Sequence, residues 1–286
     1  MFNLKGYKKG GNNMSRANDS NIVKVQYNSD KNLNARQAFH NECSINKYGW
    51  TNWIFDQYNF KPNSKVIEFG CGNGSIWVKN KNRIPKDINV ILTDFSEGML
   101  NSAKNKLSDV KEIVNYSVMD IQNIEFEDNY FDVVIANHML YHVPNRELAI
   151  SEIARVLKSD GTFYATTNGA NNMKGLKDLV TKFDSQSNYK MFSITKEFGL
   201  ENGEEQLKKH FNSIEKVIYE DSLHITNPKP LVDYILSLEG HTNINTIMTE
   251  KKVTDFYRYL EDIISKDGSI DIPKSSGMFI VKNPKK

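Results

Sequence analysis

The sequence predicts an α/β fold in which a doubly wound, mostly parallel, seven-stranded sheet carries helices on its faces. Short apolar runs alternate with segments of helical periodicity between residues 65 and 167. One of these runs, Phe131 to Ala136, is continuously apolar and rich in β-branched residues, which is typical of a strand buried on both faces. The first run leads directly into Gly70-Cys71-Gly72-Asn73-Gly74, a glycine-rich turn of the kind that binds ligands in such sheets.

The chain before the first strand is expected to contain a tail and a helical segment. Residues 1–20 are rich in Gly, Asn and Ser, so we expect a disordered N-terminal tail. Over residues 21–63, apolar and aromatic side chains recur at helical intervals, which predicts an N-terminal helical lid. Pro62-Asn63 breaks the chain before the first strand.

The parallel part of the sheet follows as alternating strands and helices. The apolar runs predict strands at 65–69, 89–93, 114–118, 131–136 and 162–167. The intervening segments predict crossover helices at 75–80, 98–106 and 146–157, the last of them ended by Gly161. Helices alternating with strands imply parallel pairing and right-handed crossovers.

The pattern changes after Gly169. Helices are expected at 173–183, 203–211, 231–238 and 253–264, and strands at 214–220 and 277–281, the last strand antiparallel. The material near 170–200 and 226–270 exceeds what a bare sheet needs. We therefore expect one domain over residues 64–286, with cap insertions in those two regions that close over the strand ends together with the N-terminal helices.

Composition excludes several classes of protein. The net charge is +2, from 37 basic and 35 acidic side chains, which gives no argument for a nucleic-acid partner. The two cysteines, Cys43 and Cys71, lie far apart in the chain, so a disulfide framework is not expected. No long apolar run and no secretory signal pattern is present, so we expect a cytoplasmic protein, monomeric or homodimeric, without membrane contact.

The glycine spacing indicates the kind of cofactor. A dinucleotide fingerprint has a third glycine where this chain has Ser75, and Glu68 precedes the first glycine by two residues. A carboxylate aimed at the turn would repel a diphosphate but would suit a cationic ligand. Asp94, at the tip of the next strand, is placed to accept hydrogen bonds from a ribose. S-adenosylmethionine fits, because it carries a sulfonium, an ammonium, a ribose and an adenine but no phosphate.

Taken together, these motifs resemble the class I S-adenosylmethionine-dependent methyltransferases, which have a Rossmann-like fold. The resemblance covers roughly residues 64 to 168. Its motifs, in the family's order, are Glu68-x-Gly70-x-Gly72-x-Gly74, Thr93-Asp94-Phe95-Ser96, Val118-Met119-Asp120-Ile121, Phe131 to His138, and Ile153 to Gly161.

The resemblance implies roles for the first two motifs. Gly70, Cys71 and Gly72 would line the methionine moiety, and Glu68 would orient the turn or the ammonium group. Asp94 would accept both ribose hydroxyls, and the alternative is that it caps the helix that follows it.

The later motifs are implied to complete the cofactor site. Phe95 would pack on the adenine, Asp120 would accept from its amino group, and Met119 or Ile121 would cover a ring face. Asn137, at the end of the fourth strand, would sit near the reacting methyl. Two alternatives stay open. Phe95, Met119 and Ile121 could be core residues, and Asp120 could be a turn residue.

Candidate catalytic residues follow the fourth strand. His138 and His142 are four residues apart and would share a face if the loop continues as a helical turn. We predict His142 as a general base and His138 as a group packed at the methionine end of the cofactor. His142 could instead order the loop or cap the following helix. A metal is not expected, because no third ligand is adjacent.

Two upstream residues are candidates for the cofactor's carboxylate. Arg36 could bind it bidentately, and Tyr27 comes second. The alternative is that Arg36 lies on a solvated helix face.

The predicted function is therefore methyl transfer from S-adenosylmethionine to a hydroxyl, amine or carboxylate of a small-molecule acceptor, releasing S-adenosylhomocysteine. Asn137-His138-Met139-Leu140 stands where nucleic-acid amino-methyltransferases carry Asn/Asp-Pro-Pro-Tyr/Phe. The alternatives are a non-catalytic S-adenosylmethionine-binding sensor or partner subunit and, with less support, a nicotinamide-dependent oxidoreductase.

Overall fold

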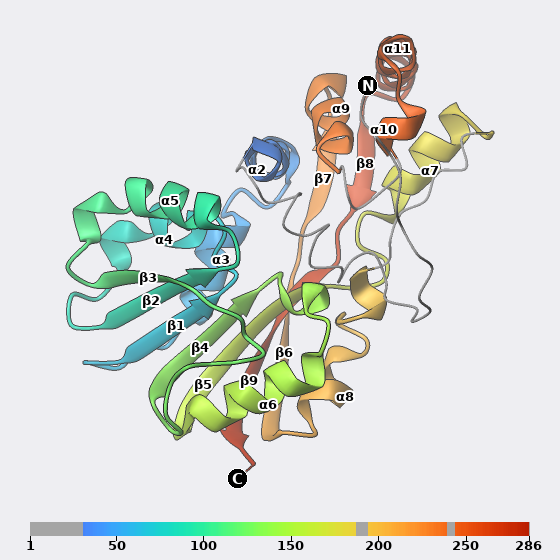
Figure 1. The fold of residues 1–286 in the computed structure, drawn as a ribbon. Helices are drawn as coiled ribbons and strands as arrows, with labels where there is room; N and C mark the ends of the chain where they lie inside the picture. The colour runs from blue at the N-terminus through green and yellow to red at the C-terminus, as the bar shows by residue number, and fades with distance from the viewer. Residues whose placement is uncertain (1–30, 187–193, 239–243, 286) are drawn as a thin grey trace, which may run out of the picture.

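The computed structural model describes residues 31–186, 194–238 and 244–285, and its main feature is a seven-stranded sheet (Figure 1). The strand order is β3-β2-β1-β4-β5-β9-β6, and β9 runs in the opposite direction to the other six strands. This confirms the predicted fold class. The strands are β1 (Lys65–Phe69), β2 (Asn89–Asp94), β3 (Val114–Val118), β4 (Phe131–Asn137), β5 (Leu157–Asn168), β6 (Phe211–Tyr219) and β9 (Ser276–Pro284).

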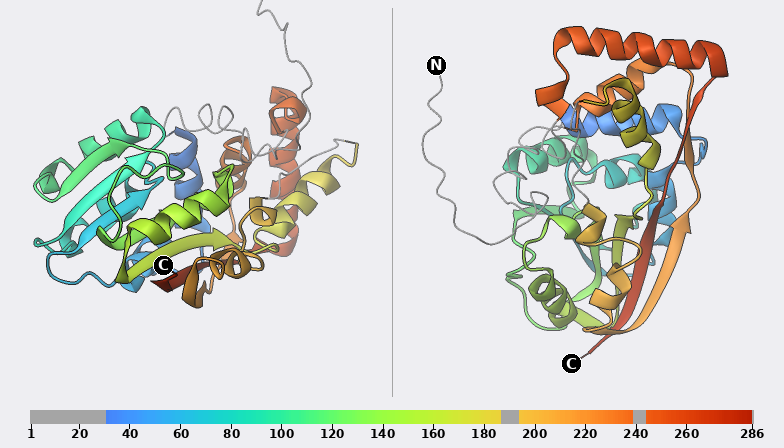
Figure 2. Two further views of the ribbon diagram at one scale, coloured as in Figure 1. Left: turned by 60° about the horizontal axis from the view of Figure 1, so that its bottom comes forward. Right: turned by 90° about the vertical axis from the view of Figure 1, so that its right-hand side faces the viewer.

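Helices cover both faces of this sheet because side chains alternate along each strand. On β1, Val66 faces the apolar cluster that includes α3 (Trp50–Gln57), whereas Ile67 faces the cluster that includes α6 (Arg146–Val156). The helices α4 (Ser75–Lys79) and α5 (Glu97–Lys106) lie with α3, and α8 (Gly203–Leu207) lies with α6 (Figures 1 and 2).

The expectation that Gly161 ends the helix before β5 is wrong. The helix α6 ends at Val156 and β5 begins at once, with Leu157 paired to Phe131. Gly161 lies inside β5, where a Cβ atom would stand 2.8 Å from Leu157 Cδ1 and 3.0 Å from the carbonyl oxygen of Asp132. Its lack of a side chain thus permits close backbone approach at an irregular point in the β4–β5 pairing.

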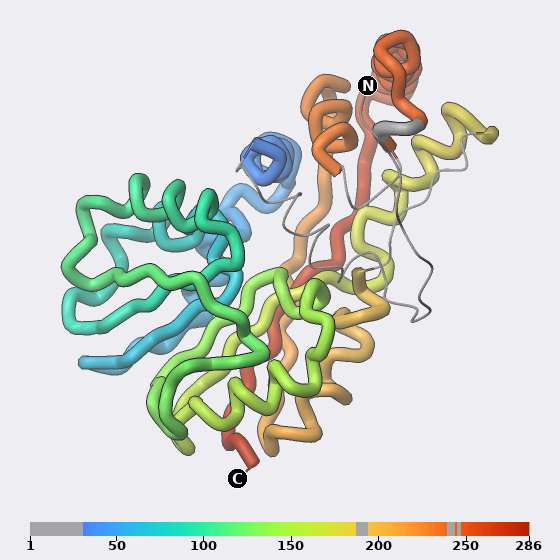
Figure 3. The backbone as a smooth tube through the Cα atoms, viewed as in Figure 1, coloured from blue at the N-terminus to red at the C-terminus, as the bar shows by residue number. Residues whose placement is uncertain are grey.

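Beyond the carboxyl ends of the parallel strands lies a second unit with its own apolar core, which we call the cap (Figure 3). It contains α2 (Lys31–Cys43), α7 (Lys174–Phe183), α9 (Pro228–Leu236), α10 (Ile244–Ile247), α11 (Glu250–Asp267) and a small antiparallel sheet of β7 (Ser222–Ile225) and β8 (Ile270–Pro273). The small sheet was not expected, because strands of four residues give too short a pattern.

Two of the connections between the cap and the main sheet are only two residues long. Residues 220–221 link β6 to β7, and residues 274–275 link β8 to β9. Figure 2 shows these strands running together from the sheet into the cap. Among the described residues, no helix is both long and apolar enough to cross a membrane. The expected tail at residues 1–20 lies outside the described residues.

Candidate cofactor-binding site

The turn after β1 is built from glycines with positive φ. Gly70, Gly72 and Gly74 have φ values of 66°, 56° and 69°. The Cys71 N–H donates to the Thr93 carbonyl over 2.9 Å, and the Gly74 N–H donates to the Cys71 carbonyl over 3.0 Å. Left-handed backbone of this kind is accessible to glycine at little cost. The turn therefore folds tightly against the end of β2.

Gly70→Ala is expected to destabilise the protein by about 2–4 kcal/mol, because it adds a steric clash to the cost of positive φ. A Cβ atom there would stand 2.9 Å from Met139 Cβ. Gly268→Ala is the matched control, because its φ is 85° and nothing lies within 4 Å of the added carbon. Chemical denaturation of both variants measures the difference. Equal losses would show that the contact with Met139 carries no cost.

Asp94 ties the glycine turn to the end of β2. Its Oδ2 accepts from the Gly72 N–H over 2.9 Å, and its Oδ1 accepts from the Ser96 N–H over 2.9 Å. Burial raises the pKa of Asp94, while the N–H groups of Ser96, Gly72 and Phe95 act in the opposite direction. The helix α5 is capped by the Ser96 hydroxyl rather than by Asp94. A carboxylate has about four lone-pair positions, so acceptor capacity remains for a ligand diol.

Two large apolar side chains stay open beside Asp94. Phe95 is 45% exposed and Val118 is 51% exposed, although Val118 is the residue paired with Asp94 across β2 and β3. Adjacent exposed apolar groups at strand ends offer a surface for a flat apolar ligand. Sequence reasoning missed Val118. Its position as the last residue of a strand beside an acid-tipped strand was the available signal.

The residues after β3 divide between the site and the core. Ile121 is 1% exposed and packs in the apolar cluster under α6, whereas Met119 is only partly buried beside that cluster. Asp120 accepts from the backbone N–H of Gln122 over 2.8 Å and from its side-chain amide over 3.0 Å. Ile121 is therefore surrounded by core residues, as the alternative interpretation of the sequence expected. Asp120 accepts hydrogen bonds within the turn that it forms with Gln122.

Glu68 and Asn137 meet in a buried hydrogen-bond network. Glu68 is 2% exposed and accepts from Trp77 Nε1 through one oxygen and from Asn137 Nδ2 through the other, the latter over 2.8 Å. Asn137 Nδ2 also donates to the Tyr58 hydroxyl over 2.8 Å. Burial raises the pKa of Glu68 to about 7, against the effect of its two donors. Trp77 and Tyr58 were not predicted here, because their sequence context is that of packing residues.

Of the two histidines after β4, His142 ends the short 3₁₀ helix η4 (Leu140–His142), and His138 lies in the bend before that helix. His138 has a φ of 48°, and its ring centroid lies 5.3 Å from that of Trp50. Burial, Lys274 and His142 lower the pKa of His138 to about 4. The centre of the His142 ring lies 4.6 Å from the centre of the Tyr141 ring. In the part of the chain that the structure describes, no group of three His, Cys, Asp or Glu residues could hold a metal ion.

The helix α2 spans from the glycine turn to the cap. Asn34 Oδ1 accepts from Asn73 Nδ2 over 2.9 Å, and Gln37 Nε2 donates to the Ser75 hydroxyl over 3.0 Å. Arg36 points instead to the cap, where its Nη1 donates to the Ser237 carbonyl over 3.1 Å. Tyr27 lies outside the described residues.

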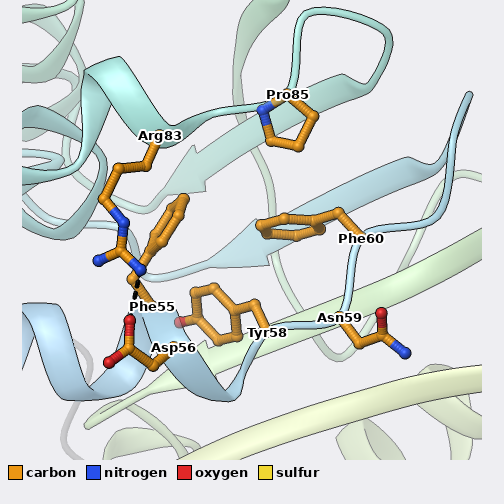
Figure 4. Close-up of a pocket in the computed structure, with 7 residues that line it drawn as sticks. All are labelled: Phe55, Asp56, Tyr58, Asn59, Phe60, Arg83 and Pro85. Carbon is orange, nitrogen blue, oxygen red and sulfur yellow. Dashed lines mark hydrogen bonds and ion pairs between the residues drawn. The ribbon is translucent and has the colours of Figure 1, made fainter.

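A surface hollow lies elsewhere, on the face covered by α3 and α4 (Figure 4). Its lining comes from the segments that enter β1 and β2 at their amino ends, opposite the glycine turn. An ion pair between Arg83 and Asp56 lies at one side of it. The hollow therefore lies apart from the glycine turn, although Tyr58 belongs both to its lining and to the network around Asn137. Its lining residues are Phe55, Asp56, Tyr58, Asn59, Phe60, Arg83 and Pro85.

Comparisons with known proteins agree with this geometry. Residues 67–165 match the model of the methyltransferase domain family. A ubiquinone/menaquinone biosynthesis C-methyltransferase from Vibrio cholerae is 29% identical over 114 residues, which are 39% of this chain and 44% of the relative. A demethylmenaquinone methyltransferase from Symbiobacterium thermophilum is 29% identical over 119 residues, 40% of this chain and 47% of the relative. The match thus spans less than half the length of these curated relatives.

Solved structures share the fold at low identity. Phosphoethanolamine N-methyltransferase 2 from Haemonchus contortus, solved with S-adenosyl-L-methionine, gives a TM-score of 0.55 at 19% identity and covers 93% of this chain and 60% of that one. The [4+2]-cyclase SpnF gives a TM-score of 0.54 at 14% identity and covers 96% of this chain and 98% of that one.

The class of protein follows from the sheet, the turn and the family match together. Residues 67–165 match the methyltransferase domain family, and this match supports the class I S-adenosylmethionine-dependent methyltransferase domain that the glycine and acid motifs predicted.

Proposed function

We propose that this chain binds S-adenosylmethionine at the carboxyl ends of β1, β2 and β3 and transfers its methyl group to a small-molecule acceptor. The observation that carries the proposal is the glycine turn held by Asp94, beside the exposed Phe95 and Val118. That arrangement supplies a diol acceptor next to an apolar surface, at the strand edge where sheets of this type bind ligands.

In this proposal each cofactor group has a partner of matching chemistry. The glycine turn, including Cys71, lines the methionine moiety and Asp94 accepts the ribose hydroxyls. Phe95 and Val118 flank the adenine, with Met119 and Asp120 at its far edge. Glu68 already accepts hydrogen bonds from Trp77 and Asn137, which supports an indirect role. In that role Glu68 fixes the turn and Asn137 rather than binding the ammonium group itself.

The acceptor is proposed from the chain's own residues, not from its relatives. The curated relatives are named as a ubiquinone/menaquinone biosynthesis C-methyltransferase and a demethylmenaquinone methyltransferase, and a structural neighbour as a phosphoethanolamine N-methyltransferase. The family match ends at residue 165, whereas most of the cap lies after it. We therefore keep a hydroxyl, amine or carboxylate of a small molecule as the acceptor. The cytoplasmic location, the absence of a nucleic-acid partner, and the monomeric or homodimeric state stay predictions.

The proposed reaction is an in-line displacement at the methyl group of a sulfonium. Alignment of acceptor, methyl and sulfur can lower the barrier by about 7–11 kcal/mol. With a pKa of about 4, His138 is uncharged at neutral pH but too weakly basic to be an efficient proton acceptor, which supports a packing role for it. The general base, where the acceptor needs one, is assigned to His142.

His142→Ala is expected to lower turnover about 100-fold with little change in cofactor affinity, as is typical of removing a general base. The assay incubates the protein with S-adenosylmethionine labelled in its methyl group and a fractionated metabolite extract, and follows label in the extract. His210→Ala is the control, because His210 pairs with Glu147 on the outer side of α6. Label transfer that is equal in both variants would remove His142 from the reaction. Tight cofactor binding without transfer to any fraction would favour a sensor.

A further inference from the structure

Two of the connections between the main sheet and the cap, residues 220–221 and 274–275, are tied together by a buried ion pair. Lys274 Nζ pairs with Asp221, and their side chains are 8% and 0% exposed. Lys274 also donates to the Ser44 hydroxyl over 3.2 Å. These residues follow β8, β6 and α2, so the pair fixes three segments at one point beside the strand ends.

Aromatic rings extend from this ion pair to the end of β4. Lys274 Nζ lies 5.7 Å from the centre of the Tyr219 ring. The centre of the Trp50 ring lies 5.1 Å from the centre of the Tyr219 ring and 5.3 Å from that of the His138 ring. The rings of Trp50 and Tyr219, which we call the aromatic wall, therefore extend from the ion pair to His138, beside which the proposed methyl acceptor would lie.

His40 stands on α2 beside this wall with an unused nitrogen. Its Nδ1 is buried and has no hydrogen-bond partner among the described residues, although the residue as a whole is only partly buried. The centre of the His40 ring lies 5.5 Å from the centre of the Tyr234 ring in the cap. Burial and Lys274 lower the pKa of His40 to about 3, with smaller contributions from His138 and Arg36 in the same direction. The imidazole is therefore uncharged at neutral pH.

The buried Nδ1 indicates which nitrogen carries the proton. Orphaned buried N–H groups are rarer in proteins than orphaned acceptors, so the favoured tautomer leaves a bare lone pair on Nδ1 and places the proton on Nε2. His40 then offers a hydrogen-bond donor at its open edge. That donor matches an oxygen of a ligand and makes His40 unsuited to act as a base.

Arg36 lies one helical turn before His40, on the same side of α2. Its guanidinium is partly buried and reaches the cap at Ser237, while Asn34 and Gln37 contact the segment at the glycine turn. The position of Arg36 thus suits a ligand between α2 and the cap better than the cofactor's carboxylate. A cation and a neutral donor side by side suit an anionic oxygen.

We propose that Arg36 and His40 form an acceptor subsite that binds a carboxylate or phosphate group of the substrate. This rests on the proposed function, and it defines the substrate as a small anionic molecule whose methylated atom lies toward His138. The aromatic wall of Trp50 and Tyr219 would pack against the uncharged part of that molecule.

The test titrates inorganic phosphate and, separately, acetate into the protein saturated with S-adenosylhomocysteine. Backbone amide shifts of α2 in ¹H–¹⁵N NMR spectra give the dissociation constants. We expect a saturable shift with at least one of the two anions. The dissociation constant is expected to rise about tenfold or more in Arg36→Ala and in His40→Ala, the loss expected for a charge-assisted hydrogen bond. His40→Gln, whose amide N–H can replace the Nε2 donor, is expected to bind within about threefold of the unmodified protein.

Two exposed residues of the same helix provide controls. Lys31→Ala removes an equal charge from α2, and Asn41→Ala changes a side chain next to His40. Neither should alter anion binding. Equal anion affinity in all variants, or no saturable shift with either anion, would overturn the subsite. Amide shifts recorded on adding S-adenosylhomocysteine alone, before the anions, separate this outcome from a failure of cofactor binding, which would refute the proposed function instead.

Discussion

Replacing Asp94 by alanine is expected to weaken the binding of S-adenosylhomocysteine by about 1.5–3 kcal/mol, because charge-assisted hydrogen bonds to the ribose diol are lost. The same change removes the acceptors of the Gly72 and Ser96 N–H groups, so the turn itself loses its anchor on β2. Isothermal titration calorimetry of the folded variant measures the loss directly.

Two further variants separate the effects at Asp94. Asp94→Asn keeps one acceptor oxygen and the shape of the side chain, so we expect an intermediate affinity. Glu97→Ala removes a nearby exposed carboxylate from the first turn of α5 and should leave affinity unchanged. If Asp94→Ala binds as tightly as the unmodified protein, Asp94 does not contact the ligand.

The buried Glu68 is expected to make stability depend on pH. Its pKa of about 7 in the folded protein lies above the ordinary value of 4.5, so the folded state holds a proton that the unfolded state has lost between these values. Stability from this group is therefore complete at low pH and is lost as the pH rises through 7. Relative to Glu68→Gln, the free energy of unfolding should fall by about 2–3 kcal/mol between pH 5 and pH 8.

Urea denaturation at pH 5, 6, 7 and 8 measures this difference. The control is Glu112→Gln, at an exposed position, which should follow the pH dependence of the unmodified protein. A constant difference between Glu68→Gln and the unmodified protein at every pH would show that Glu68 keeps one protonation state throughout this range.

Most of the main sheet could be predicted because its signals are local. β1 and β3 occur at the predicted residues, since each is a short apolar or alternating run between turn signals. The small sheet of β7 and β8 could not be predicted in this way. Each of its strands has four residues, and their pairing depends on the cap packing around them.

The candidate site shows the same division. The glycine turn and Asp94 were predictable because a strand of this fold delivers its ligand-facing residues at its carboxyl end. Glu68 was expected to face the turn or the ligand, but the Trp77 side chain of α4 reaches back to it, and no local pattern contains that contact. His40 faces the cap only because α2 crosses from the glycine turn to α9, which is a tertiary arrangement.

The central claim is that the turn after β1 binds an adenosyl amino acid rather than a dinucleotide. The most direct measurement is calorimetric titration of the folded protein with S-adenosylhomocysteine and, in parallel, with NAD. We expect a saturable one-to-one isotherm with S-adenosylhomocysteine and no heat of binding with NAD. A flat trace with S-adenosylhomocysteine, or saturable binding of NAD in its place, would contradict the account.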